Sequence, residues 1–335
     1  MELRCVDLRA GHFHSWMIAL GVTRVYRGCK LRWEHAAGDD PLNSYAVFRS
    51  EDATEDDFLQ SLNAALYAAL VDPDECGALP DGNGLAYDQY AEIAKKVRGL
   101  EHVRDSGFWL SSLWVDLVRK NNAGVLMTQE SRLYLGRKFF LLSQNLQDAV
   151  QVVWGQSDDK ALTPVQHLRS ALRLSSSSDW NVIDSQIVWS EKDTAAQCVG
   201  FDPAHYQPNG TPPIYAFAAE ELLTYSALAY FPSRGRRSEN PKLTPSHWVR
   251  GARGGESKSQ TLLSYSIWSD PLDLWGIDAL LGMWFSRGTQ SLFYDNARDQ
   301  HHSRRPMELP IWDAYPVINS GEKVPSVVGV TTRAR

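Results

Sequence analysis

The sequence predicts an α+β protein, in which helices are mixed with short antiparallel sheets in two lobes and one lobe carries a long basic Gly/Pro-rich loop. The chain has 335 residues, about twice a typical domain length. Hydrophobic residues make up 43% and charged residues 22% of it, as in globular proteins. Apolar residues recur at helical spacing in some segments and alternate with polar ones in others, which predicts both kinds of element. We place a boundary near residue 155, between lobes 1–155 and 156–335.

The first lobe is predicted to begin with a helix over residues 15–26, with Ser15 as its N-cap. Alternating apolar residues predict strands over 30–35 and 45–49. Thr54 and the acidic residue three positions later form a variant of the capping box, so an acidic helix with apolar positions 58, 62, 66 and 70 follows. The same spacing predicts further helices over residues 86–103, 108–119 and 130–153.

The second lobe is predicted to begin with a helix after Thr163, because proline and glutamine follow at the first helical and capping-box positions. This helix ends before the serine run 175–178. Later elements follow from the same rules: a strand over 186–189, a helix over 214–231 that Pro232 stops, a strand over 262–268, a helix over 274–285 and a short β-prone tail over 326–332.

The sequence favours a cytoplasmic protein without membrane contact. No run approaches the roughly eighteen apolar residues of a membrane span, and the amino terminus has no apolar stretch like that of a signal peptide. The four cysteines stand far apart and form no C-x-x-C pair, so buried free thiols are predicted in place of a zinc site or disulfides; they are Cys5, Cys29, Cys76 and Cys198.

Charge is distributed unevenly along the chain. The net charge is −6, but the segment 34–92 holds fourteen acidic residues against one basic residue, which leaves +7 for the remainder. Part of this excess lies at the start of the chain, where six basic residues face only Glu2 and Asp7; they are Arg4, Arg9, Arg24, Arg27, Lys30 and Arg32. The rest is concentrated in segment 232–258, which we call the basic segment.

The basic segment holds seven basic residues, two acidic ones, three prolines and four glycines. This composition buries little apolar surface, so we predict a long cationic loop. Arginine contacts phosphates and guanine edges in bidentate fashion, asparagine contacts base edges, and an aromatic side chain in such a loop can stack on an unpaired base. The candidate nucleic-acid-binding residues are therefore Asn209, Arg234, Arg236, Arg237, Asn240, Lys242, Trp248, Arg250, Arg253 and Lys258.

Motifs for common enzyme chemistry are missing from the sequence. It contains no P-loop, dinucleotide fingerprint, nucleophile elbow or H-E-x-x-H motif, and we expect no cofactor. The alternative is a metal-dependent nuclease or hydrolase built on His12, His14, His301 and His302. If the H-x-H pair at 12 and 14 lies on a strand, both rings point to the same side, as a metal site requires.

Five segments in order resemble a CRISPR-associated protein of subtype I-G, formerly I-U. They are SWMIALGVTRVY from Ser15, LRW from Leu31, GFDPAHY from Gly200, AAEELLTYSALAYFP from Ala218 and YSIWSDPLDLWGIDALL from Tyr265. Together they cover about a sixth of the chain.

The resemblance implies a large-subunit-type protein of a Cascade surveillance complex. Such a subunit has no catalytic centre. It recognises the protospacer-adjacent motif in target DNA beside the guide RNA, contacts the other complex subunits and presents the DNA to a separate helicase-nuclease. The acidic helix after Thr54 is then expected to face away from nucleic acid, because like charges repel within a Debye length. A protein-only adaptor is the remaining alternative.

Overall fold

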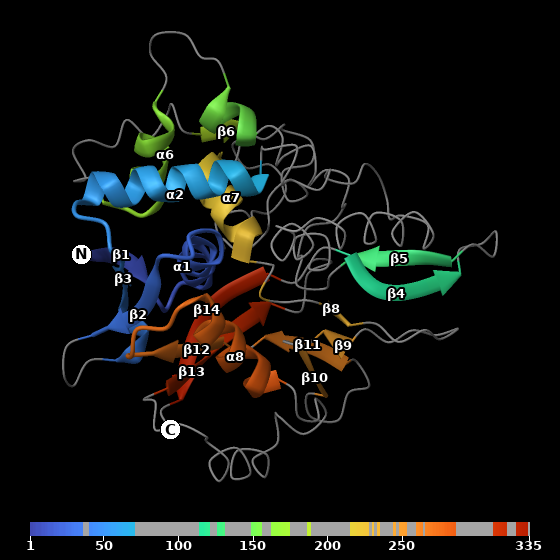
Figure 1. The fold of residues 1–335 in the computed structure, drawn as a ribbon. Helices are drawn as coiled ribbons and strands as arrows, with labels where there is room; N and C mark the ends of the chain where they lie inside the picture. Colours follow the sequence, from blue (N-terminus) through green and yellow to red (C-terminus); the bar gives the residue numbers. More distant parts are fainter. Residues whose placement is uncertain are drawn as a thin grey trace.

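The computed structural model combines helices with small antiparallel sheets, an α+β arrangement (Figure 1). The residues that the structure describes are 1–35, 40–70, 114–120, 126–130, 149–155, 162–174, 186–188, 215–227, 230, 233–234, 244–245, 248–252, 259–263, 265–285, 311–319 and 326–333.

A three-stranded antiparallel sheet opens the chain. Its strands are β1 (Glu2–Arg9), β2 (Lys30–Glu34) and β3 (Tyr45–Arg49), in the order β1-β3-β2. The helix α1 (Phe13–Val25) connects β1 to β2, and both strands pair with β3, which gives a split β-α-β arrangement. A short 3-10 helix, η1 (Pro41–Asn43), precedes β3. The predictions for the second and third strands are confirmed, whereas β1 had not been predicted.

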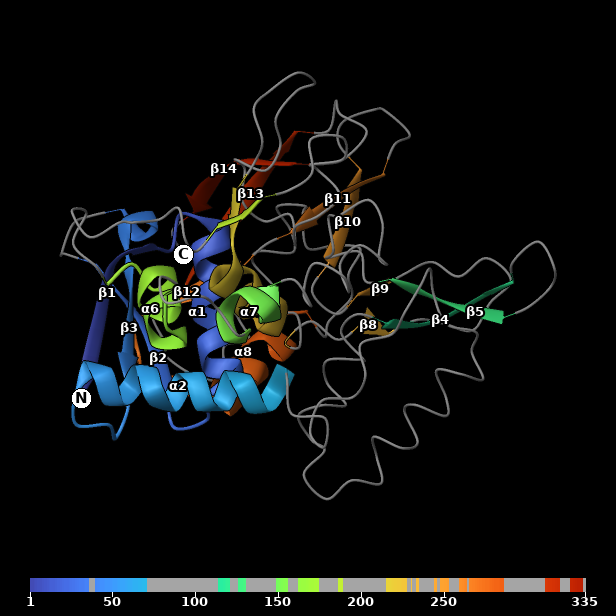
Figure 2. The ribbon, with the colours of Figure 1, turned by 90° about the horizontal axis from the view of Figure 1, so that it is seen from above.

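Two buried helices cross behind this sheet. Figures 1 and 2 show α1 and α7 (Ala218–Ala227) on the same side of it. Every residue of α7 is buried. Two of its hydroxyl groups bond to the helix's own backbone: Thr224 Oγ1 donates to the carbonyl of Glu220 (3.0 Å) and Ser226 Oγ to that of Leu222 (2.7 Å). A helix buried all round in this way belongs to the centre of a core.

The acidic helix packs against two helical segments from later in the chain. It is α2 (Glu55–Leu70), whose apolar side chains Phe58, Leu62 and Leu66 are buried as predicted. Residues 149–154 are helical, and Trp154 donates from its indole to Asn63 Oδ1 of α2 at 2.8 Å. The helix α6 (Pro164–Ala171) begins with the predicted capping box between Thr163 and Gln166, in which both reciprocal hydrogen bonds are present.

A C-terminal group of elements lies against β2. The strands β12 (Tyr265–Trp268), β13 (Ile311–Asn319) and β14 (Ser326–Arg333) form an antiparallel sheet in that order, and α8 (Leu274–Phe285) follows β12. The Trp268 indole donates to the carbonyl of Leu31 at 2.9 Å, and its ring meets that of Trp33 edge-to-face with centroids 6.5 Å apart. Both tryptophans are fully buried.

Four two-stranded antiparallel ladders complete the described elements. They are β4 (Trp114–Lys120) with β5 (Leu126–Glu130), β6 (Gln186–Val188) with β7 (Tyr215–Phe217), β8 (Ser233–Arg234) with β9 (Thr244–Pro245), and β10 (Trp248–Ala252) with β11 (Ser259–Leu263).

Several predicted elements are wrong in type or extent. The helix predicted over 108–119 ends in the strand β4, and position 130, where another helix was predicted to start, closes β5. The valines and tryptophan of β4 (WVDLVRK) favour a strand, and β5 (LMTQE) is a strand through its pairing with β4. Residues 215–217 form β7 instead of the start of α7, and the single strand predicted over 262–268 is divided between β11 and β12.

The hydrophobic core draws on residues from both sides of position 155. One cluster of buried side chains includes Leu20, Phe58, Leu168, Leu222 and Ile277. Cys5 and Cys29 are buried free thiols, as predicted, whereas Cys76 and Cys198 lie outside the described residues. The boundary at residue 155 and the division into two lobes stay predictions. In the part of the chain that the structure describes, no helix has both the length and the apolar character to cross a membrane.

Stability is expected to fall below neutral pH because of His167 in α6. Its side chain is buried, and burial lowers the pKa of the imidazole below its usual 6.5, outweighing a backbone hydrogen bond at Val152 that raises it. Above pH 6.5 the imidazole is neutral in both the folded and the unfolded chain, so its contribution to the free energy of unfolding is constant. As pH falls through 6.5 toward the lower folded-state pKa, the unfolded chain takes up the proton first and stability is lost.

Urea unfolding at pH 7.5 and pH 5 measures this loss. The matched variant His167→Leu removes the titrating group and is expected to show a smaller difference between the two pH values. An equal difference in both proteins would contradict the assignment to His167.

Candidate nucleic-acid interface

Three of the predicted nucleic-acid-binding residues lie in described strands. Arg234 is in β8, opposite Thr244 of β9. Trp248 and Arg250 are in β10, opposite Leu263 and Thr261 of β11. The other seven fall outside the described residues: Asn209, Arg236, Arg237, Asn240, Lys242, Arg253 and Lys258.

Both ends of the basic segment adjoin core elements. Its first strand, β8, follows Tyr230, which is buried and accepts or donates a hydrogen bond with Thr23 Oγ1 of α1 at 3.1 Å. After the segment, β11 leads through residue 264 into β12, where Ile267 and Trp268 are buried. In the sequence, therefore, buried residues flank the segment on both sides: Tyr230 lies two positions before it, and Ile267 and Trp268 lie nine and ten positions after it.

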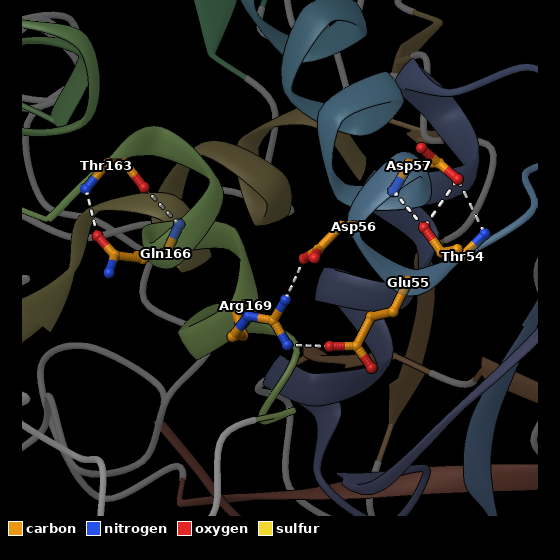
Figure 3. Close-up of polar contacts among 7 residues, drawn as sticks. All are labelled: Thr54, Glu55, Asp56, Asp57, Thr163, Gln166 and Arg169. Carbon is orange, nitrogen blue, oxygen red and sulfur yellow. Dashed lines mark hydrogen bonds and ion pairs between the residues drawn. The ribbon is translucent and has the colours of Figure 1, made fainter.

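The acidic start of α2 is occupied by a contact within the protein. Figure 3 shows Arg169 of α6 reaching both Glu55 and Asp56, with 2.5 Å between Arg169 Nη2 and Asp56 Oδ1. Thr54 Oγ1 caps the helix by accepting from the backbone of Asp57 at 3.2 Å. Two of the acidic residues thus hold α2 against α6, and the expectation that this helix faces away from nucleic acid stays a prediction.

The two histidines near the amino terminus do not lie on a strand, which is the condition under which both rings would point to one side. Residues 13–25 are helical, His12 is the exposed residue before α1, and His14 lies in its buried first turn. Because i and i+2 positions of a helix do not face each other, the expectation that both rings point to one side is wrong. His14 Nε2 instead lies 2.9 Å from Glu220 Oε2 of α7, and both side chains are at least nine-tenths buried. His301 and His302 lie outside the described residues.

A second buried polar contact involves Arg24 near the end of α1. Burial lowers the pKa of its guanidinium, and the neighbouring Tyr230 and Asp278 act in the opposite direction. Burial likewise raises the pKa of Asp278 in α8, and Arg24 lowers it. Arg24 is buried and Asp278 is half-buried, so the electrostatic interaction links the end of α1 to α8.

A cationic surface lies on the exposed face of β1-β3-β2. We call it the cationic sheet face and define it as Arg4, Lys30, Arg32, Tyr45 and Arg49, with the carboxylates Glu2 and Glu34 among them. The strand registers place these residues in rows: Glu2, Arg49 and Lys30 form one row, and Arg4, Val47 and Arg32 form the next. Val47 is fully buried, as expected where long arginine stems cover an apolar neighbour.

Glu34 is held as a carboxylate on this face. Tyr45 donates its hydroxyl to Glu34 Oε1 at 2.7 Å, and Arg32 Nη2 lies 2.6 Å from Oε2. The hydrogen bond from Tyr45, and then the charges of Arg32 and Arg4, lower the pKa of Glu34. The same hydrogen bond raises the pKa of Tyr45. The phenol ring is thereby tethered at its hydroxyl end.

For the cationic sheet face, the sequence indicated only an excess of basic residues at the start of the chain. Arg4, Lys30 and Arg32 belong to its cationic excess, but β1 was not predicted, so the alternation that places them on one face was not recognised. The exposure pattern of β1, in which Glu2, Arg4 and Val6 are exposed and Leu3 and Cys5 are buried, is the missing signal.

The cationic sheet face presents arginine, lysine and tyrosine side chains, which can bind a polyanion. Among the described residues, no three or more histidine, cysteine or acidic side chains gather where they could hold a metal ion. Compared with known proteins, the chain matches no protein-family model, no curated protein and no solved structure.

Proposed function

We propose that the protein is a non-catalytic nucleic-acid-binding subunit of a type I CRISPR surveillance complex. In this role it recognises the protospacer-adjacent motif and target DNA beside the guide RNA, contacts the other subunits and presents the DNA to a helicase-nuclease. The observation that carries the proposal is the segregation of charge, because a chain of net charge −6 collects seven basic residues in segment 232–258. The resemblance to subtype I-G proteins supplies the biological setting.

The physical argument starts from the arginines of the basic segment. Five of its seven basic residues are arginines, whose planar guanidinium forms paired hydrogen bonds with phosphates and guanine edges. Arg234 and Arg250 belong to strands, and the segment begins and ends beside buried elements. These features support a cationic arm on the second lobe, partly built of strands, that offers its arginines to a duplex.

In such a complex, the guide RNA and the protein have different roles in recognising DNA. Guide pairing supplies the sequence specificity, while the protein reads a short duplex motif and holds the DNA by its backbone. Five arginines that engage five phosphates would give a plot of log affinity against log salt with a slope of about −4.5.

Replacing Arg234, Arg236, Arg237, Arg250 and Arg253 together by glutamine tests the proposal. We expect the variant to lose duplex DNA binding in gel-shift assays, because the five arginines no longer displace counterions from the DNA phosphates. Thermal unfolding of the variant checks that the core is intact. Undiminished binding at moderate salt would contradict the proposal, and wild-type protein that binds partner subunits but shows no DNA affinity would identify a protein-only adaptor.

A further inference from the structure

The cationic sheet face carries a like-charge contact that the fold itself does not require. Lys30 of β2 and Arg49 of β3 are directly opposite in the strand register, and both are exposed. Like charges at directly opposed positions destabilise a sheet. Among the described residues neither forms an ion pair, and the carboxylate in the same row, Glu2, lies 3.4 Å from Arg32 and 3.9 Å from Arg4 instead.

The neighbouring row adds two more cations at the same face. Arg4 and Arg32 flank Val47 from the two sides. The Arg4 side chain is 55% exposed, so it remains available to a ligand while it contacts the carboxylates. Arg4, Lys30, Arg32 and Arg49 face only Glu2 and Glu34 here, which leaves an excess of positive charge on a sheet face in an otherwise acidic protein.

We propose that the cationic sheet face binds a single-stranded nucleic acid, with Lys30 and Arg49 contacting phosphates and the ring of Tyr45 stacking on an unpaired base. The binding surface is separate from the basic segment. It therefore does not depend on how that segment engages duplex DNA, and it adds a second contact with a different class of nucleic acid.

Two observations favour a single strand as the occupant. The outer strands of a three-stranded sheet lie about 10 Å apart, which forms a narrow, flat platform that suits a single backbone. Tyr45 lies directly opposite Glu34 in the row beyond Val47 and Arg32, and its hydroxyl is tethered to Glu34 at 2.7 Å, so its ring is already oriented when a base arrives. Stacking on aromatic side chains requires bases that are not paired.

The variant Lys30→Gln/Arg49→Gln separates a binding role from a structural one. Removing the like-charge pair is expected to leave the melting temperature unchanged or raised, because the repulsion disappears. Binding is expected to weaken. The probes are oligouridine and oligo-dT of about 12 nucleotides, measured by fluorescence anisotropy over a salt series. The salt slope should shrink by about 1.4, so the variant should bind roughly 25-fold more weakly than the wild type at 0.1 M salt, taking the two affinities as equal at 1 M.

A matched control has the same change in net charge at the other end of the molecule. Arg119 and Lys120 lie in β4, which Figures 1 and 2 both draw far from the β1-β3-β2 sheet. The control variant Arg119→Gln/Lys120→Gln should keep the wild-type salt slope. If the control loses as much affinity as Lys30→Gln/Arg49→Gln, the effect is one of overall charge and the proposal is overturned.

Tyr45 provides a second, charge-independent test. Tyr45→Leu should weaken binding at least fivefold, whereas Tyr45→Phe keeps the ring and should retain the stacking. Comparing the RNA and DNA probes identifies which strand the face prefers. Wild-type affinity in both Lys30→Gln/Arg49→Gln and Tyr45→Leu would overturn the inference. The proposed function is tested separately, by duplex DNA binding of the basic segment.

Discussion

Gly21→Ala is expected to destabilise the protein by about 2 kcal/mol or more, because Gly21 lies where α1 crosses α7. A methyl group at this position would overlap the carbonyl oxygen of Leu223 and lie 2.6 Å from its carbonyl carbon. Backbone atoms cannot turn aside, so the two helices must separate and loosen the core around them. Overpacking of this kind costs about 1 to 3 kcal/mol or more, which exceeds the gain of about 1 kcal/mol in helix propensity.

Gly276→Ala in α8 is the matched control. Its added methyl group would lie 3.3 Å from the Leu272 side chain and 3.4 Å from the Asp273 carboxylate, which accepts from the Gly276 N–H; both are side-chain contacts at longer distances than the backbone overlap at Gly21. We expect this variant to be neutral or stabilised by up to about 1 kcal/mol, since alanine is the better helix former. Urea unfolding of both variants measures the contrast, and equal stabilities for the two would contradict the close crossing of α1 and α7.

The sequence predicted the elements whose signals are local. The capping box at Thr163 and Gln166, the acidic start of α2 after Thr54 and the alternation in residues 45–49 each involve residues within a few positions of one another. A short polar side chain at a helix start acts on backbone groups two or three residues ahead, so the pattern specifies the structure almost alone.

The elements that the sequence did not predict depend on distant partners. The strand β1 pairs with β3, which lies 36 to 47 residues further along the chain, and its register shifts between Cys5 and Arg9, which breaks the alternation. The start of α1 at Phe13 places Ser15 inside a buried turn, because the helix packs on α7 and the packing decides where it begins. Register and packing between segments far apart leave little trace in either segment alone.

The candidate binding residues also fall into a group that the sequence reveals locally and a group that depends on distant partners. Composition alone identified the basic segment, because clustered arginines need no structural context to be counted. The cationic sheet face required the register, since Lys30 and Arg49 become neighbours only when β2 pairs with β3. The partner of His14 was equally hidden, as Glu220 lies 206 positions further along the chain.

His14→Leu is expected to cost about 3 to 5 kcal/mol, because it leaves the carboxylate of Glu220 buried without its imidazole partner. His14 and Glu220 are 5% and 7% exposed, so water cannot replace the lost contact. Glu220→Leu should cost less, about 1 to 3 kcal/mol, since a neutral imidazole tolerates the loss of a partner better than a carboxylate does. Unfolding in urea measures both values.

The double variant His14→Leu/Glu220→Leu decides whether the two residues act as a pair. Replacing a buried pair by apolar side chains of similar volume removes the desolvation cost of both, so the double variant should be more stable than His14→Leu. His12→Leu, at the exposed position before α1, is the control and should lie within about 0.5 kcal/mol of the wild type. If His14→Leu fails to fold while the double variant folds, the unpaired carboxylate is the cause. Strictly additive losses would instead mean that the 2.9 Å contact contributes no coupling between α1 and α7.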